Sequence, residues 1–425
     1  PVHEIWTGVK GDDKHGGIYL YKYEADENKL LLVRQEVRLR GFTHIAMSSD
    51  KNTLLVTGKT DTDQDVLQSY RIADQNGSLR FMNETVLHTA GDVCHLSISP
   101  DKKIIAVTDF ADGAVHFYEM DKEGKIGAFI QRLEFKGSSV SYRQDRAHPH
   151  SAFFTADSKY CYVADFGSDK VWILEHKNNE KTFDITGSWS APAGSGPRHI
   201  AFHEKNGYTY TIMEMSAQIA AWKATKRAET EELQIINIAN HELPGNFGEV
   251  GEDGLPQHYM AAGDIAISKT GEFIAASVRG HYEIVILRVL PDGRMELASR
   301  LPVRGAVRTI RFNKEGDILF TLGERMGHST GIMEIFKRKA TYHTDASQYR
   351  CKDTFKLIAI STISRHGYKP SCKHGSCQTS EHSCYDVGNK FYFRYIDTGH
   401  SCCIRVTSYK IDISSKYGLF QNERQ

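Results

Sequence analysis

The sequence predicts an all-β protein, a seven-bladed β-propeller with four-stranded antiparallel blades, and three observations support this expectation. A short pattern recurs six times at intervals of 45 to 65 residues: a polar residue, an alternating apolar strand, a turn and a second apolar strand. The period-2 alternation within each repeat is typical of β-strands. Two further strand-like segments follow in the repeats, and units of this size bury their faces by stacking or by closing into a ring.

The expected units follow one another without a break. A degenerate first unit has candidate strands at 4–8, 17–23 and 29–33. The six regular units begin at His44, His95, Ser151, His199, Asp264 and Thr309. Third strands are expected at 114–120, 170–175, 218–223 and 283–289, followed by less apolar segments such as 295–301. One degenerate and six regular units give seven blades over residues 1–340, and ring closure removes the exposed ends of the stack.

The composition excludes several classes of partner. Lys and Arg number 53, as do Asp and Glu, so the formal net charge is zero and no nucleic-acid or membrane-surface partner is expected. No stretch approaches the roughly 20 apolar residues of a membrane span. The N-terminal residues lack the charged and apolar regions of a secretory signal. We therefore expect a cytoplasmic protein.

Residues 341–425 are expected to form a separate Cys-rich extension of unknown fold. Six of the eight cysteines lie there, which favours disulfides in a secreted protein and a metal or no ligand in a cytosolic one. The spacings do not match the C-x2-C pairs of zinc sites, so no metal is predicted. The segment 355–363 has strand character and is a candidate for closing the ring. A stabilised appendage, a disordered tail and an artefact of gene structure remain alternatives. Cys94 and Cys161, within the repeats, are expected to be buried.

Two connections between blades are unusually long, at about 136–149 and 240–260. Long loops in compact repeats are commonly functional, and an insertion tolerated on the surface is the alternative. The first loop carries Arg143, Arg146 and His148.

The repeat register predicts which side chains share one mouth of the central channel. In a blade the first strand leaves one rim and the second returns to it, so the residue before the repeat and the residue fifteen positions after its start lie together. In blades four to seven these positions hold His150, Arg198, Glu214, Arg279, Arg308 and Glu324. An imidazole, two carboxylates and three guanidiniums around one funnel suit an anionic substrate and acid–base chemistry. A structural ion pair between Arg198 and Glu214, and a strand-start role for His150, are the alternatives.

Four motifs resemble the lactonase family of seven-bladed β-propellers over about residues 1–340. They are His148-Pro-His-Ser151, Gly196-Pro-Arg-His199 with Ile-Ala-Phe-His203, Thr211-Ile-Met-Glu214, and Ala262-Gly-Asp-Ile265 with Ala276-Ser-Val-Arg279. The family includes bacterial-type 6-phosphogluconolactonase and the fungal carboxy-cis,cis-muconate lactonising enzyme. The resemblance implies an active-site cluster of His150 (or His148), Arg198, Glu214 and Arg279. It also implies hydrolysis of a sugar lactone without a metal or cofactor, or lactone formation in the muconate branch.

We therefore expect a lactonase acting on a small anionic sugar lactone, with 6-phosphogluconolactone as the leading substrate. Glu214 or His150 is expected to act as the base, and Arg198 and Arg279 to hold the anion and stabilise negative charge on the carbonyl oxygen. Further substrate contacts are expected from His148, Arg308, Glu324 and His199. The alternatives are a muconate-type cycloisomerase and a non-catalytic interaction scaffold. The scaffold is favoured if the charged residues pair off within single blades.

Overall fold

The computed structural model describes residues 2–73, 78–177, 181–225, 229–239, 262–324, 330–342, 351–364, 392–397 and 400–405. The chain divides into two compact units, Pro1–His366 and Gly367–Gln425. In the described part of the second unit, β28 (Tyr392–Asp397) and β29 (His400–Arg405) form an antiparallel hairpin. The described residues include no helix long and apolar enough to cross a membrane.

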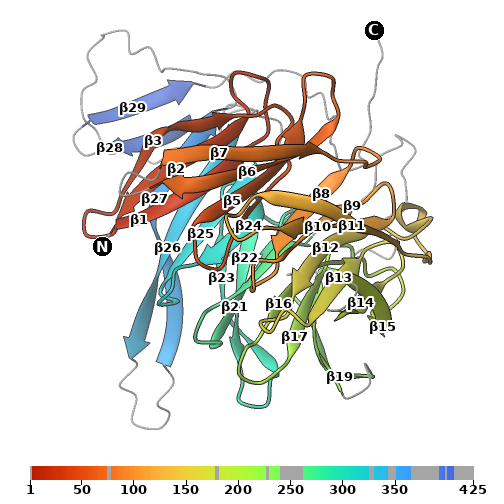
Figure 1. Ribbon diagram of the computed structural model, residues 1–425. Coiled ribbons are helices and arrows are strands. Elements are labelled where there is room, and N and C mark those ends of the chain that lie inside the picture. Colours follow the sequence, from red (N-terminus) through yellow and green to blue (C-terminus); the bar gives the residue numbers. More distant parts are fainter. Residues whose placement is uncertain are drawn as a thin grey trace, which may run out of the picture. The chain divides into compact units, whose positions relative to one another are not determined.

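The first unit is a seven-bladed β-propeller, as predicted, and its blades follow one another along the chain (Figure 1). The first blade has three described strands, β1 (Val2–Val9), β2 (Gly17–Glu24) and β3 (Lys29–Arg38), at the three segments that the sequence marked in the degenerate unit. The other six blades have four strands each. They are β4–β7 (His44–Met47, Thr53–Lys59, Asp65–Ala73, Ser78–Val86), β8–β11 (Val93–Ile98, Ile104–Asp109, Ala114–Met120, Ile126–Glu134), β12–β15 (Pro149–Phe154, Tyr160–Asp165, Lys170–Lys177, Thr182–Ser190), β16–β19 (Pro197–Phe202, Thr209–Met213, Gln218–Ala224, Thr230–Asn237), β20–β23 (Ala262–Ile267, Phe273–Val278, Glu283–Val289, Met295–Pro302) and β24–β27 (Ala306–Phe312, Ile318–Glu324, Thr330–Tyr342, Cys351–Ser364).

The second strand is fully buried in several of the regular blades, because both of its faces are covered. Every residue of β5, β9 and β21 is buried. Strands buried on both faces have nearly continuous apolar sequences, whereas the outer strands alternate between covered and exposed residues. Cys94 in the first strand of the third blade and Cys161 in the second strand of the fourth are buried and form no disulfide, as expected for small apolar residues.

The ring closes by packing of the first blade against the seventh. Val9 and Tyr21 of the first blade form a buried cluster with Met333 of β26. A second cluster joins Tyr23 to Ile318 and Ile335. Apolar side chains therefore complete the ring between sheets that lie at opposite ends of the unit's sequence.

The propeller extends beyond residue 340, where the sequence placed its end. The strand β27 pairs with β26 along its whole length, and Phe355 packs into the core beside Phe273. The candidate segment 355–363 is thus a strand, and it forms the outermost strand of the seventh blade. The compact unit ends at His366, so the extension is shorter than expected. The side chains of Cys351, Cys402 and Cys403 and the residues Cys372, Cys377 and Cys384 lie outside the described part, and so do the expected disulfide and metal alternatives.

Candidate active site

A β-bulge begins the innermost strand of several blades and leaves one residue of that strand out of the pairing register. The strand registers skip one residue between Pro149 and Ser151, between Pro197 and His199, and between Val307 and Thr309. Bulges of this kind re-aim a side chain beside functional sites. The skipped residues are His150, Arg198 and Arg308, three of those that the repeat register assigned to the mouth. The third blade has the same bulge at Cys94.

Glu214 lies at the centre of a buried cluster, in which its carboxylate binds three guanidinium groups. It follows β17, and its side chain is almost fully buried. Arg198 Nη1 lies 2.7 Å and Arg279 Nη2 3.0 Å from Glu214 Oε2. Arg143 Nη2 lies 3.0 Å from the other oxygen, Oε1. The arginines come from the fifth blade, the sixth blade and the loop before the fourth, so the charges do not pair off within one blade.

The positive environment keeps Glu214 ionised. Burial alone would raise the pKa of this carboxyl, but Arg279, Arg198 and Arg143 outweigh it and hold the pKa well below 4.5. Glu214 is therefore a weak proton acceptor in this arrangement and a strong anchor for the three arginines.

Two of the arginines are also fixed by backbone carbonyls of β20. Arg198 Nε donates to Gly263 O at 2.8 Å, and Arg279 Nη2 donates to Ala262 O at 3.0 Å. Gly263 occupies the register position at which other blades carry Thr, Cys, His or Arg. A glycine at this position leaves room for the Arg279 side chain, which comes from the end of β21 in the same blade.

His150 joins the cluster through Arg198. Arg198 Nη1 forms a hydrogen bond with His150 Nε2. A guanidinium has only donors, so Nε2 is the acceptor and the ring is neutral. Burial, then the charge of Arg198, lowers the pKa of His150 well below 6.5.

His148 occupies a different environment from His150. Its ring stacks on Phe110 with centroids 4.4 Å apart, Nδ1 lies 2.8 Å from Phe110 O, and Nε2 lies 2.9 Å from Asp145 Oδ1. Of the two histidines that the motif offered, the structure brings His150 to Glu214.

His199 lies beside the cluster, inside the channel. Its Nδ1 is 2.7 Å from Asp264 Oδ1, and its ring centroid is 5.4 Å from that of His150. Asp264 Oδ2 accepts from Ile310 N at 2.8 Å and from Arg311 Nη1 at 2.9 Å. Burial lowers the pKa of His199, although the hydrogen bond with Asp264 opposes this. His199 is thus held as part of a buried polar network.

Arg308 and Glu324 form an ion pair with each other in the seventh blade. They occupy the same two register positions as Arg198 and Glu214, but both side chains are more exposed. The structure therefore places a second Arg–Glu pair at this mouth, two blades away from the first.

Arg143 is the residue of the cluster that the repeat register did not identify. It lies in the short 3-10 helix η1 (Tyr142–Gln144), and its guanidinium carbon is 4.6 Å from the centre of the Phe166 ring. The only signal in the sequence was the length of the 136–149 loop with its basic residues. The second long loop, 240–260, lies outside the described residues.

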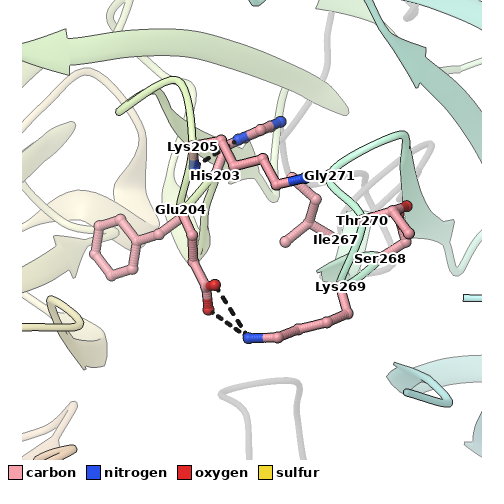
Figure 2. Close-up of a pocket in the computed structure, with 9 residues that line it drawn as sticks. His203, Glu204, Lys205, Ile267, Ser268, Lys269, Thr270 and Gly271 are labelled. Carbon is pink, nitrogen blue, oxygen red and sulfur yellow. Dashed lines mark hydrogen bonds and ion pairs between the residues drawn. The ribbon is translucent and has the colours of Figure 1, made fainter. Parts of the chain in front are cut away.

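Two cavities lie away from this cluster. One, of about 100 Å³, lies between the β16–β17 and β20–β21 turns, where Lys269 Nζ is 3.0 Å from each carboxylate oxygen of Glu204 (Figure 2). These turns are at the opposite end of the strands from Glu214. The other cavity, of about 390 Å³, is lined by residues of the first two blades, including Arg38, Arg40 and Lys59.

Among the described residues, one group has the composition of a metal site. Asp109, Asp112 and His116 have ligand atoms within 4.8 Å of one another. However, Arg132 binds both oxygens of Asp112, at 2.8 and 2.7 Å, and Asp109 Oδ1 accepts from the amides of Ala111 and Asp112. This arrangement stabilises a turn, and it lies outside the Glu214 cluster.

Comparison with known proteins gives a consistent picture. Residues 4–343 match the family model described as lactonase, 7-bladed beta-propeller. The chain is 25% identical over 337 residues to 6-phosphogluconolactonase of Bacillus subtilis, covering 79% of this chain and 90% of that protein. It is 30% identical over 353 residues to an uncharacterized protein of Staphylococcus saprophyticus, covering 79% and 95%.

Solved structures share the fold. The periplasmic gluconolactonase PpgL of Pseudomonas aeruginosa superposes with a TM-score of 0.69 at 20% identity, covering 86% of this chain and all of that one. A Lactobacillus plantarum protein gives a TM-score of 0.68 at 18% identity, covering 85% and 100%. The family match covers most of the chain, and the chain therefore belongs to the lactonase family of seven-bladed β-propellers.

Proposed function

We propose that the protein hydrolyses 6-phosphogluconolactone to 6-phosphogluconate at the Glu214 cluster. The observation that carries this proposal is the convergence of three guanidiniums and a neutral imidazole on one buried carboxylate. Guanidiniums bind phosphate and carboxylate oxygens in a bidentate manner, so the cluster suits a lactone that carries an anionic group. The similarity to the B. subtilis enzyme supports the same substrate.

We assign a separate chemical role to the arginines and to the histidine. Arg198 and Arg279 are oriented by Glu214 and by carbonyls of β20, so their N–H groups are preorganised to stabilise the oxyanion that forms on the lactone carbonyl. When the lactone oxygen replaces His150 as the acceptor of the Arg198 Nη1 donor, Nε2 is released to accept a proton, while the bonds from Arg198 to Gly263 O and Glu214 keep the guanidinium in place. Of the two expected bases we favour His150, because the carboxylate of Glu214 already binds three guanidiniums, whereas His150 Nε2 accepts from Arg198, the donor that the lactone oxygen would take.

The proposed reaction balances in two steps. A water oxygen bonds to the carbonyl carbon while one of its protons passes to His150 Nε2. The tetrahedral intermediate then breaks the bond between that carbon and the ring oxygen, and the proton on His150 passes to the departing oxygen as it becomes a hydroxyl group. The product is an open-chain acid, which ionises at neutral pH.

The test is a panel of lactones offered to the purified protein, with product formation corrected for spontaneous hydrolysis. We expect 6-phosphogluconolactone to be hydrolysed fastest, and Arg279→Ala to lower kcat/KM by about 100-fold, the loss typical of removing one oxyanion-stabilising donor. Lys269→Ala, at the far end of the strands, is the control and should match the wild type. Turnover of carboxymuconolactone in place of the sugar lactones would assign the cycloisomerase reaction. The scaffold alternative would gain support if none of the lactones were turned over.

A further inference from the structure

Arg143 reaches the site on a loop that is firmly attached to the propeller. Ser141 and Gln144 form a capping box around η1, in which Arg143 N donates to Ser141 Oγ and Ser141 N donates to Gln144 Oε1. The buried Gln144 amide donates to Phe166 O and to Asp169 Oδ1, both at 2.8 Å. The loop therefore presents Arg143 from a fixed position.

Arg143 contacts Glu214 differently from the other two arginines. Arg198 and Arg279 share Oε2, and Arg198 also contacts His150, the expected proton acceptor. Arg143 binds Oε1 and lies over the face of Phe166. Its side chain is 12% exposed, against 5% for Arg198 and 8% for Arg279, so it is the most accessible of the three.

A phosphorylated sugar lactone places two demands on the site. Its phosphoryl group is joined to the reacting carbonyl through C6, C5 and the ring oxygen. The phosphoryl oxygens and the carbonyl oxygen are therefore separate anionic sites, and each needs its own positive group. Arg198 and Arg279 lie at the side of Glu214 that faces His150. A guanidinium carries five N–H donors, so Arg143 can contact Glu214 and a phosphoryl oxygen at the same time.

We infer that Arg143 is the residue that selects phosphorylated over unphosphorylated sugar lactones, by binding the phosphoryl group. This inference rests on the proposed lactone hydrolysis at Glu214. The selectivity then comes from an inter-blade loop, whereas the carbonyl is activated by residues of the blades.

The first experiment compares kcat/KM for 6-phosphogluconolactone with kcat/KM for δ-gluconolactone. In Arg143→Gln the ratio of the two values should fall about 10- to 100-fold, as expected for loss of a hydrogen-bonded charge, and mainly through KM of the phosphorylated lactone. Arg143→Lys should restore part of the ratio. The matched control is Arg146→Gln, because Arg146 lies on the same loop, is well exposed and pairs with Asp145 at 3.4 Å; it should keep the wild-type ratio. A ratio that stays at the wild-type value in Arg143→Gln would overturn the inference, as would a loss confined to kcat.

A second experiment measures binding without turnover. Titration calorimetry with 6-phosphogluconate and gluconate should show that the wild type prefers the phosphorylated acid, and that Arg143→Gln loses this preference while its thermal unfolding stays cooperative. If the wild type turns over neither lactone, the proposed function fails. The binding preference for 6-phosphogluconate over gluconate still tests whether Arg143 binds the phosphoryl group. Equal binding of the two acids by the wild type, or an unchanged preference in the variant, would contradict the role assigned to Arg143.

Discussion

Gly263 lies directly against Arg279. A Cβ on Gly263 would be 3.2 Å from Arg279 Cγ, 2.5 Å from Ser277 Oγ and 2.7 Å from Val307 O. Because Val307 O belongs to the backbone and cannot rotate away, the added Cβ must displace the Arg279 side chain or shift the innermost strands. We expect Gly263→Ala to lower kcat/KM about tenfold, because small displacements of a positioning group weaken catalysis strongly.

A control separates this effect from a loss of stability. Gly207 lies at the other end of the fifth blade with a φ of +73°, and a Cβ there would meet no neighbouring atom within 4 Å. Gly207→Ala should cost about 1 kcal/mol of stability because of its left-handed backbone, with unchanged kinetics. Steady-state kinetics and thermal unfolding of both variants make the comparison. Unchanged kcat/KM in Gly263→Ala would show that Arg279 is not sensitive to this contact.

The pH dependence of the reaction tests the role of His150. Burial and Arg198 keep the pKa of His150 well below 6.5, so the ring is neutral and able to accept a proton throughout the range from pH 6 to 8. We expect kcat/KM to be constant over this range. The measurement should use δ-gluconolactone, because a phosphate monoester itself ionises near pH 6. An acidic limb with a midpoint near pH 6.5 would mean that the base has an ordinary histidine pKa.

Buried neutral histidines make the stability of the propeller sensitive to mild acid. Burial lowers the pKa of His95, His150 and His199, whereas in the unfolded chain each protonates near pH 6.5. The unfolded state therefore binds more protons below pH 6.5, and stability falls as the pH decreases, by about 1.4 kcal/mol per pH unit for each such group. Glu214 adds to the loss only below about pH 4.5, its ordinary value.

Urea denaturation at pH 7, 6 and 5 measures this slope. His95→Phe keeps an aromatic ring in the channel but removes one proton-binding site, so its stability should depend less steeply on pH. The exposed His88→Gln is the control and should follow the wild type. Equal slopes in the wild type and His95→Phe would contradict the assignment of His95 to this group.

Asp264 is expected to stabilise the channel by joining three partners. It accepts from His199, from the amide of Ile310 and from Arg311. Asp264→Asn keeps the shape but loses the charge, and should lower the free energy of unfolding by about 2 kcal/mol, as for other hydrogen bonds to buried charged groups. Arg311→Gln should cost less than about 1 kcal/mol, because the Arg311 side chain is largely exposed. Denaturant midpoints of the two variants show which one loses more unfolding free energy. A larger loss for Arg311→Gln than for Asp264→Asn would contradict the central role of Asp264.

The repeat made the fold and much of the cluster predictable. Strand alternation and a nearly constant period are local properties, so they identified the blades and the positions of Arg198, Glu214 and Arg279 at one mouth. The register assigned His150 to the mouth, whereas the resemblance left His148 as an alternative because both lie near the strand start. The bulge that skips His150 decides between them, and a bulge depends on pairing with β13.

The features that the sequence did not reveal depend on contacts outside the repeat. Arg143 belongs to an inter-blade loop, so no register position marks it, and its place follows from the anchoring of Gln144 to Phe166 and Asp169. The strand β27 begins at Cys351, beyond the last sequence repeat, so the repeat spacing does not mark it. Its pairing with β26 extends the propeller past residue 340.

The most direct test of the central claim is the hydrolysis of 6-phosphogluconolactone by Glu214→Gln. The substitution keeps the size of the side chain but removes the charge that orients Arg143, Arg198 and Arg279. We expect a kcat/KM about 100-fold or more below that of the wild type, comparable to the loss of a preorganised electrostatic group. A variant that folds normally and hydrolyses the lactone at the wild-type rate would contradict this expectation.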